Sequence, residues 1–197
     1  MENKKMERSK EGITAIESVY DRVLELLPSD KNLKILDAGC GIGNLIKRLL
    51  EDGFKNITGL DMEDSLKIKN PFIKADLNKE LMLNEKFDVI ICQEVIEHLE
   101  NPRHLLRELK KILRKDGIMI LTTPNIFYWK ARIYYPLKGI IWGFREEDYK
   151  VSGHITPITK YDFKRICNEE NLRLIQITYN NSDKELFGNN LMVVIGK

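Results

Sequence analysis

The spacing of apolar residues changes several times along the chain, and each change predicts a new element of secondary structure. Short continuous apolar runs predict buried strands, whereas apolar residues three and four positions apart predict amphipathic helices. Strands are expected over residues 33–36, 56–60, 72–75, 87–92, 118–122, 172–179 and 191–195. Helices are expected before and between them, over residues 13–27, 45–53, 101–117 and 159–171.

The order of these elements predicts the fold class. Strand and helix alternate at short intervals up to residue 122, which is typical of a mainly parallel sheet with right-handed crossovers. The run 87–92 is apolar after its first residues, as in a strand that is covered on both faces. A polar loop joins the last two strands, which predicts an antiparallel hairpin. We therefore expect an α/β protein with a doubly wound, mostly parallel, Rossmann-like sheet and helices on both faces.

The chain is expected to form one domain over residues 1–197, because its length suffices for one core and no linker or repeat interrupts the pattern. Residues 1–30 are expected to contribute an N-terminal helix. Residues 125–155 depart from the pattern, because they are rich in aromatic side chains and lack a clean period. We expect this segment to be a lid-like insertion.

Composition and charge argue against several classes of protein. The formal net charge of +2 is too small to indicate a nucleic-acid partner, and no basic stripe is interleaved with base-stacking aromatics. Four cations are interpreted as lying at the C-terminal end of a predicted helix, where they complement the negative end of its dipole: Lys110, Lys111, Arg114 and Lys115. No run approaches the roughly 18 apolar residues of a membrane span. The three cysteines form no CxxC pair and are expected to be reduced and half-buried. The charged start contains no signal segment, so we expect a cytoplasmic protein.

The segment Asp37–Gly43 (DAGCGIG) joins a strand to a helix and is the main candidate for a ligand site. Its glycines permit a tight bend and let a ligand lie against the backbone. In an open parallel sheet such a turn lies at the carboxyl edge, where ligands bind. The dinucleotide fingerprint would require a glycine where this chain has Asn44. The carboxylate of Asp37 would repel a pyrophosphate, and it suits a ligand that carries an ammonium group.

Two further aspartates follow the next strands. Asp61 lies at the tip of the second strand, where a carboxylate can accept hydrogen bonds from both hydroxyls of a ribose. Asp76 follows the third strand and could accept from the exocyclic amine of an adenine. Each aspartate alone could instead cap a turn. Three carboxylates at successive strand tips around one glycine turn favour a cationic ligand that carries a nucleoside.

These motifs resemble those of class I S-adenosylmethionine (SAM)-dependent methyltransferases: LDAGCGIG, GLDM, ADL and FDVIICQEVIEHLENP. The EVIEH segment is similar to that of ubiquinone-type O-methyltransferases, and TPNIFYWKAR with GHITPITKYDF is similar to the methionine-biosynthesis-associated methyltransferase-like proteins. The resemblance implies strand order 3-2-1-4-5-7-6 with the last strand antiparallel, and SAM as the cofactor. The cofactor-binding residues that it implies are Asp37, Gly39, Cys40 and Gly41 for the methionine part, Asp61 for the ribose, Met62, Asp76 and Leu77 for the adenine, and Gln93 beneath the methionine part.

The resemblance implies transfer of a methyl group from SAM to a small-molecule acceptor, and we expect that acceptor atom to be oxygen. A neutral hydroxyl acceptor requires a general base. His154 is the preferred candidate, because it lies in the lid-like segment and an imidazole pKa of about 6.5 suits proton abstraction; His98 is the second candidate. His154 could instead pin the lid through a hydrogen bond to the backbone.

A metal site was weighed at Glu94, Glu97 and His98, which would share one face of a helical segment. An ordinary helix start explains the same residues, so no metal is predicted.

Two alternatives remain open. The aromatic and basic residues of 125–155 predict an acceptor lid that attracts an anionic group, but Pro136–Phe144 could also contact a membrane surface peripherally. A nucleotide-dependent oxidoreductase is disfavoured by Asn44 and Asp37. The alternative function is that of a SAM-binding regulatory or partner protein without turnover of its own.

Overall fold

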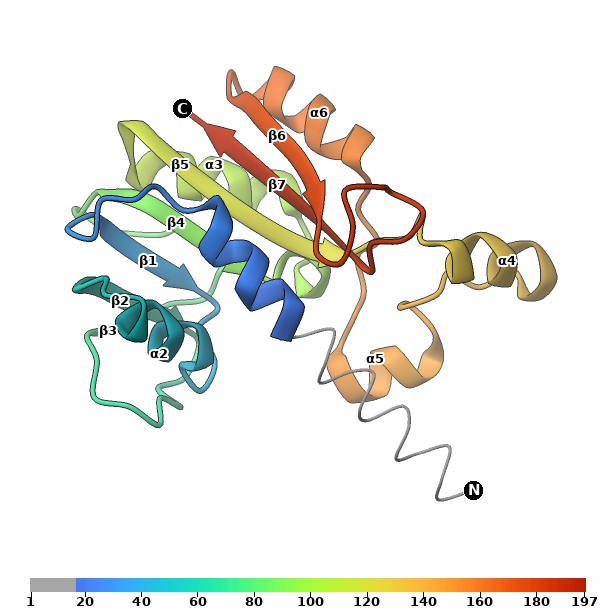
Figure 1. Cartoon of the computed structure of the whole chain (residues 1–197), viewed down its shortest axis with the longest axis horizontal. Helices are drawn as coiled ribbons and strands as arrows, with labels where there is room; N and C mark the ends of the chain where they lie inside the picture. Colours follow the sequence, from blue (N-terminus) through green and yellow to red (C-terminus); the bar gives the residue numbers. More distant parts are fainter. Residues whose placement is uncertain (1–16) are drawn as a thin grey trace.

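Seven strands form one sheet through the middle of the molecule, in a computed structural model that describes residues 17–197 (Figure 1). Their bounds are β1 Lys34–Ala38, β2 Asn56–Asp61, β3 Phe72–Lys74, β4 Phe87–Gln93, β5 Leu113–Pro124, β6 Arg173–Tyr179 and β7 Asn190–Gly196. They pair in the order β3-β2-β1-β4-β5-β7-β6. β7 runs antiparallel to both of its neighbours, and the other pairs are parallel. The expected fold class, strand order and antiparallel strand are confirmed.

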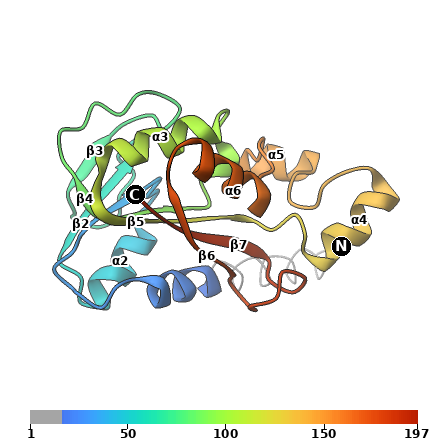
Figure 2. The ribbon, with the colours of Figure 1, turned by 90° about the horizontal axis from the view of Figure 1, so that it is seen from above.

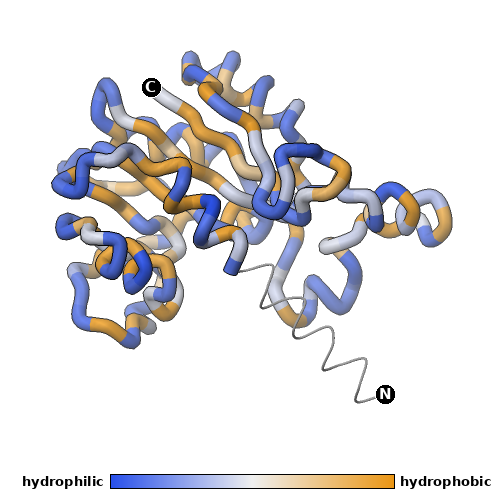
Figure 3. Tube along the Cα trace, in the orientation of Figure 1, coloured by the Kyte–Doolittle hydropathy of each residue, from blue (hydrophilic) through white to orange (hydrophobic). Residues whose placement is uncertain are grey.

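Helices cover both faces of this sheet, because successive strand residues point to opposite sides (Figure 2). The helix over residues 17–26 and α2 (Asn44–Glu51) pack in one core with Ile35 of β1. α3 (Pro102–Ile112) and α6 (Lys160–Glu169) pack in the other core with Leu36. The tube in Figure 3 shows apolar residues concentrated on the strands between these layers. The expected part of the first helix before residue 17 lies outside the described residues.

The starts of α3 and α6 follow their local sequence. The Asn101 side chain accepts a hydrogen bond from the His104 amide, and Pro102 occupies the first turn, where its missing N–H is not needed. Thr159 and Asp162 form a reciprocal capping box at the start of α6. These caps fix where both helices leave the carboxyl edge of the sheet.

The expected end of α3 at Gly117 is wrong: the helix ends at Ile112, and β5 begins at Leu113. Leu113 pairs with Phe87 of β4, and the pairing then shifts before it resumes further along both strands. Arg114 therefore lies on β5, where its guanidinium contacts the Asp88 carboxylate at 2.6 Å. Of the four cations assigned to the helix end, Lys110 and Lys111 lie in the last turn of α3, whereas Arg114 and Lys115 do not. Pairing with β4 decides this boundary.

Between β5 and α6 the chain forms two short helices, α4 (Trp129–Lys138) and α5 (Glu146–Ser152). α4 projects away from the sheet beyond the end of β5 (Figure 1). Each helix ends at a glycine in the left-handed region, Gly139 at φ 67° and Gly153 at φ 73°. The segment without a clean sequence period thus contains two helices that bury almost no side chains, Ala131 on α4 and none on α5.

A short 3-10 helix, η1 (Ile96–His98), follows β4 directly. The cysteines are all free and buried, which is deeper than the half-buried positions expected from the sequence: Cys40, Cys92 and Cys167. Among the described residues, no helix combines the length and apolar character that crossing a bilayer requires.

Ile91 tests the central core, because it lies on β4 with no exposed surface. Ile91→Ala removes most of a packed side chain and leaves a cavity, so we expect the free energy of unfolding to fall by about 2–5 kcal/mol. Urea denaturation followed by circular dichroism measures the loss. Ile175→Ala is the control, since Ile175 on β6 is 46% exposed, and it should lose less than about 1 kcal/mol. Equal losses would contradict the packing described here.

Candidate functional site

The turn between β1 and α2 presents bare backbone at the carboxyl edge of the sheet. It takes left-handed backbone angles at three glycines: Gly39 (φ 84°), Gly41 (φ 51°) and Gly43 (φ 88°). A Cβ atom at Gly39 would overlap the Val95 side chain, whereas one at Gly41 would meet nothing within 4 Å. The Gly39 and Cys40 amides donate to the Leu60 carbonyl at 2.7 and 3.1 Å. The turn is therefore fixed to β2 and open at Gly41.

Two buried acceptors beside the turn have no partner among the described residues: Oδ2 of Asp37 and Oε1 of Gln93. Asp37 is 2% exposed near the end of β1, and Gln93 ends the neighbouring strand β4. Burial, followed by the charge of Asp61, raises the pKa of Asp37 to about 7. An unsatisfied buried polar group costs roughly 1–3 kcal/mol. Both oxygens would be satisfied by a ligand with donors, and an ammonium group fits them.

Asp61 links the turn to the tip of β2. Its Oδ2 accepts from the Gly41 amide at 2.8 Å, and its Oδ1 accepts from the Met62 amide at 2.7 Å. Each carboxylate oxygen has a second lone pair, so Asp61 can also accept from hydroxyls of a ligand. The Met62 side chain is 58% exposed, which leaves it open to a flat ring.

At the tip of β3 the contacts of Asp76 match the turn-capping interpretation. Its Oδ1 accepts from the Asn78 amide at 2.9 Å, and its Oδ2 lies 3.4 Å from Nζ of Lys79. The hydrogen bond from Asn78 is the main reason that the pKa of Asp76 is lowered. The Leu77 side chain is buried and packs in the core. Contacts of Asp76 and Leu77 with an adenine therefore stay predictions.

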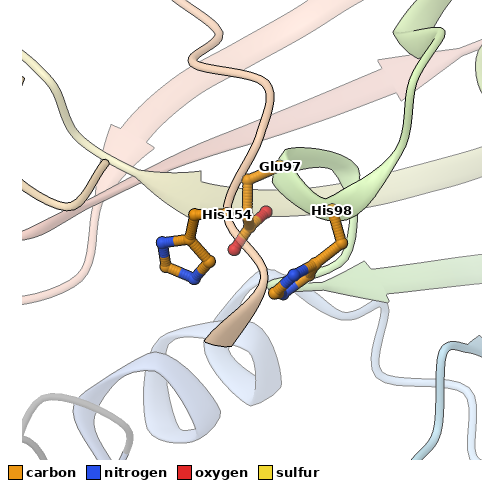
Figure 4. Close-up of side chains that lie close together, drawn as sticks. All are labelled: Glu97, His98 and His154. Atoms are coloured by element: carbon orange, nitrogen blue, oxygen red, sulfur yellow. The ribbon is translucent and has the colours of Figure 1, made fainter. Parts of the chain in front are cut away.

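A second polar cluster lies where η1 meets the segment after α5, and consists of Glu97, His98 and His154 (Figure 4). One ligand atom from each side chain lies within 4.8 Å of the other two. The amides of Ile155 and Thr156 each donate to the Glu97 carbonyl at 2.9 Å. These two hydrogen bonds hold His154 beside η1, although 56 residues separate it from His98 in the sequence.

Glu97 is the buried centre of this cluster. It is 0% exposed, and neither carboxylate oxygen has a hydrogen-bond partner among the described residues. Burial, followed by the charge of Glu94, raises its pKa well above the usual value. Burial, followed by the charge of His154, lowers the pKa of His98, so that ring is neutral and keeps a lone pair at neutral pH. A carboxylate with two imidazoles is a ligand set for a divalent cation.

Glu94 does not share a helical face with Glu97 and His98, contrary to the face expected for a helical segment. Its backbone is left-handed at φ 51°, and η1 begins only at Ile96. The Glu94 carboxylate accepts from Thr122 Oγ1 at 2.6 Å and from Asn190 Nδ2 at 2.7 Å. His154, rather than Glu94, is therefore the third member of the cluster.

His154 makes the backbone hydrogen bond that the sequence suggested as one of its two roles, and the role of general base stays a prediction. Its Nδ1 lies 2.6 Å from the Gly143 carbonyl, which can only accept, so Nδ1 carries the proton of the neutral ring. This bond pins the segment. Nε2 then keeps the lone pair, which can accept a proton or bind a cation.

Sequence periodicity did not identify Tyr20 as part of the site, because it belongs to the apolar stripe of the first helix. The ring is half-buried, and the Arg48 guanidinium lies 4.9 Å from its centroid. Burial raises the pKa of Tyr20, and hydrogen bonds with Asn44 and Gln93 lower it in part. A helical period does not reveal which strand ends the helix crosses, so only tertiary packing places this hydroxyl beside Gln93.

The chain is similar in sequence to methyltransferases. A family model described as a methyltransferase domain matches residues 11–177. The ubiquinone biosynthesis O-methyltransferase of Rickettsia canadensis is 31% identical over 120 residues, which cover 56% of this chain and 50% of that protein. Its counterpart in Rickettsia typhi is 28% identical over 184 residues, covering 88% and 70%. The chain spans about half the length of the first of these curated relatives.

Solved structures share the fold at low sequence identity. An S-adenosylmethionine-dependent methyltransferase from Mesorhizobium loti superposes with a TM-score of 0.71 at 17% identity, covering 91% of this chain and 98% of that one. Magnesium protoporphyrin IX methyltransferase from Synechocystis PCC 6803, solved with bound SAM, has a TM-score of 0.63 at 16% identity, covering 92% and 79%. With the family match, these likenesses confirm the resemblance to class I SAM-dependent methyltransferases.

The pKa of Asp37 predicts a pH-dependent stability for the ligand-free protein. Its folded value of about 7 lies above the ordinary 3.8, so the folded protein binds this proton more tightly than the unfolded chain does. The resulting stability is complete below pH of about 4 and is lost as the pH rises to about 7. Asp37→Asn cannot ionise, so it should gain stability relative to the wild type across that range. Guanidinium denaturation at a series of pH values measures the difference.

Asp76→Asn is the matched control, because the pKa of Asp76 is lowered rather than raised. This variant should lose stability relative to the wild type as the pH rises through the lowered value and the ordinary 3.8. A constant difference for Asp37→Asn between pH of about 4 and 7 would show that Asp37 is not a buried proton-binding group.

Proposed function

The chain belongs to the methyltransferase domain family, and from this premise we propose that it transfers a methyl group from SAM to a hydroxyl oxygen of a small molecule. The observation that carries the proposal is the pair of unpartnered buried acceptors on Asp37 and Gln93 beside an open glycine turn. The O-methyltransferase relatives support oxygen as the acceptor atom. The net charge of +2 favours a small acceptor over a nucleic acid.

The described residues fit the chemical groups of SAM. Its ammonium group suits the free oxygens of Asp37 and Gln93, and its ribose suits Asp61. The backbone of the turn, at Gly39, Cys40 and Gly41, would run along the methionine part. The adenine would lie on Met62, with Asp76 and Leu77 at its border. When bound, SAM supplies a methyl group on a sulfonium, which is already a good leaving group.

The protein would contribute position and a proton acceptor. Holding both ends of the cofactor fixes the direction in which the methyl group points, and such positioning is worth up to about 7–11 kcal/mol. As the new oxygen–carbon bond forms, the hydroxyl proton must leave. Nε2 of His154 is the proposed acceptor, since Nδ1 is committed to the Gly143 carbonyl. His98, neutral by its lowered pKa, is the second candidate.

As an alternative to this direct proton transfer, since Nε2 of His154 has a single lone pair, we propose a divalent cation held by Glu97, His98 and that nitrogen. Glu97 supports it, because a buried carboxylate without a partner is favourable only when protonated or beside a cation. When bound, the cation would lower the pKa of a hydroxyl beside it and so assist deprotonation. The site that the sequence placed second to an ordinary helix start contained Glu94, whereas the site proposed now has His154 in its place, because Glu94 is bonded to Thr122 and Asn190.

We also propose that the chain is one domain in which residues 125–155 act as a lid. This segment brings Gly143, Phe144 and His154 to the candidate site. The Phe144 and His154 rings lie 5.6 Å apart, so the segment contributes an apolar wall beside the histidine. Three buried free cysteines favour the cytoplasm as the setting.

Turnover tests the proposed function directly. Purified protein should release S-adenosylhomocysteine from SAM when it is supplied with a panel of phenols, catechols and sugar hydroxyls. SAM binding without release for any acceptor would favour the alternative, a SAM-binding regulatory protein.

Asp61→Ala tests the ribose contact. Loss of charge-assisted hydrogen bonds of about 1.5–3 kcal/mol should weaken SAM binding roughly tenfold to a hundredfold. Isothermal titration calorimetry measures the affinity, and circular dichroism verifies the fold. Glu63→Ala is the control, because Glu63 is an exposed acid two residues away. Unchanged SAM affinity in Asp61→Ala would remove Asp61 from the site.

Glu97→Gln tests the cation site. Mn²⁺ added to the wild type should displace the proton that the raised pKa of Glu97 retains, so its binding should strengthen as the pH rises. Calorimetry in buffers of different ionisation enthalpy detects the released proton. Glu97→Gln should bind Mn²⁺ at least about tenfold more weakly and release less proton, whereas the exposed Glu100→Gln should match the wild type. Equal Mn²⁺ binding in both variants would refute the site.

A further inference from the structure

Tyr20 reaches the carboxyl edge of the sheet from the helix over residues 17–26. Its half-buried ring packs against the apolar core that contains Ile35 of β1. Four polar side chains of the candidate site act on its hydroxyl, and they come from β1, from the start of α2 and from the end of β4: Asp37, Asn44, Gln93 and Glu94. The hydroxyl therefore lies where these three elements meet, and the proposed function assigns it no task.

Arg48 of α2 holds the ring of Tyr20 in this place. Its guanidinium lies 4.9 Å from the ring centroid, and it also forms salt bridges with Asp21, at 3.1 Å, and with Glu17. Both acids belong to the same helix as Tyr20. Because one cation contacts the ring and is paired with its helix, turning the ring away from the site would break the cation–π contact.

The side chains around the hydroxyl determine which hydrogen bonds it makes. Burial is the main cause of the raised pKa of Tyr20, so the phenol is neutral at neutral pH. Hydrogen bonds with Asn44 and Gln93 lower that pKa, which identifies their amide groups as donors to the phenolic oxygen. The charges of Asp37 and Glu94 raise it, because they favour the form that keeps the proton. The Tyr20 oxygen is therefore the acceptor for the amide nitrogen of Gln93.

A bond to one end of the Gln93 amide directs its other end. The amide has a carbonyl oxygen that accepts and an NH2 group that donates. With Nε2 donating to Tyr20, Oε1 faces elsewhere, and Oε1 is a buried acceptor without a partner among the described residues. Asp37 Oδ2, on the neighbouring strand, is another. The opposite orientation would present the NH2 group of Gln93 to the ammonium group of a ligand, so both partners would be donors.

We propose that Tyr20 is a positioning residue, which orients the Gln93 amide so that Oε1 accepts from the ammonium group of SAM. The inference rests on the proposed function, since it concerns the ammonium group of that cofactor. Asn44 contributes the second hydrogen bond to the hydroxyl. The dinucleotide fingerprint would place a glycine at this position, and a glycine has no side chain that could donate. The departure from that fingerprint thus serves the same site.

Tyr20→Phe removes the hydroxyl and keeps the ring. Nε2 of Gln93 then loses its acceptor, so isothermal titration calorimetry should show SAM binding weakened about fivefold or more. Methylthioadenosine, which contains the adenosine and the sulfur but no ammonium group, should bind this variant and the wild type equally. Tyr161→Phe is the matched control, because Tyr161 on α6 is 55% exposed, and its SAM affinity should equal that of the wild type.

Gln93→Met separates orientation of the amide from a direct contact of Tyr20 with the cofactor. This change removes the amide and keeps a side chain of similar length, so SAM binding should fall roughly tenfold. With no amide left to orient, adding Tyr20→Phe should weaken binding by less than about twofold more. Circular dichroism verifies that all variants are folded. The measurement is binding, so it applies equally to a protein that holds SAM without turnover.

The outcomes separate this inference from the proposed function. No SAM binding by the wild type would overturn both. When the wild type binds SAM, unchanged affinity in Tyr20→Phe would overturn the inference alone. Losses that add fully in the double variant would do the same, because they would show that Tyr20 and Gln93 act independently. A matching loss of methylthioadenosine affinity in Tyr20→Phe would show that the hydroxyl supports only the packing of the helix.

Discussion

Burial of carboxylates without a counter-charge is the constraint on which the carboxyl edge of this sheet depends. Asp37 lies near the end of β1, and Glu97 lies in η1, just after the neighbouring strand β4. Both are almost fully buried, and three of their four carboxylate oxygens have no partner among the described residues. Both act on the same buried thiol, since burial and then Glu97 and Asp37 raise the pKa of Cys92. Burial in a low dielectric favours the neutral carboxyl form of both groups, and a nearby cation or hydrogen-bond donor favours the ionised form. Both proposed ligands, the ammonium group beside Asp37 and the cation beside Glu97, would relieve this cost of burial.

The doubly wound sheet explains why such groups gather here. Most side chains within the strands pack in the two apolar cores, and the unpartnered buried oxygens of Asp37, Gln93 and Thr123 lie in the last two residues of their strands. Where parallel strands end, the backbone turns and side chains of neighbouring strands converge. The glycine turn that follows is open at Gly41, where a Cβ atom would meet nothing within 4 Å, and is packed against Val95 at Gly39. The candidate site therefore follows from the fold, because the sheet brings these strand ends together.

Much of the fold and of the candidate site could be predicted from the sequence, because apolar runs indicate the strands and aspartates follow at their ends. The positions of Asp37 and Asp61 followed from that pattern, whereas the order of the strands came from the family resemblance. The errors lie where tertiary contacts decide. Pairing of Leu113 with Phe87 ends α3 early, and the bonds from Thr122 and Asn190 turn Glu94 away from Glu97. The cluster of Glu97, His98 and His154 needed a contact across 56 residues that no local period encodes.

The segment between β5 and α6 is fixed at both of its ends and exposed in its middle. At its start, the Asn125 amide donates to the carbonyls of Glu185 and Gly188 at 2.7 and 2.8 Å. At its end, Ile155 and Thr156 bind the Glu97 carbonyl. α4 lies between these anchors, with Ile133 54% and Leu137 74% exposed. His154 Nδ1 also lies 2.6 Å from the Gly143 carbonyl, so the backbone just after α4 and the position of the histidine are linked, and a change in this part of the segment would be transmitted to the candidate site.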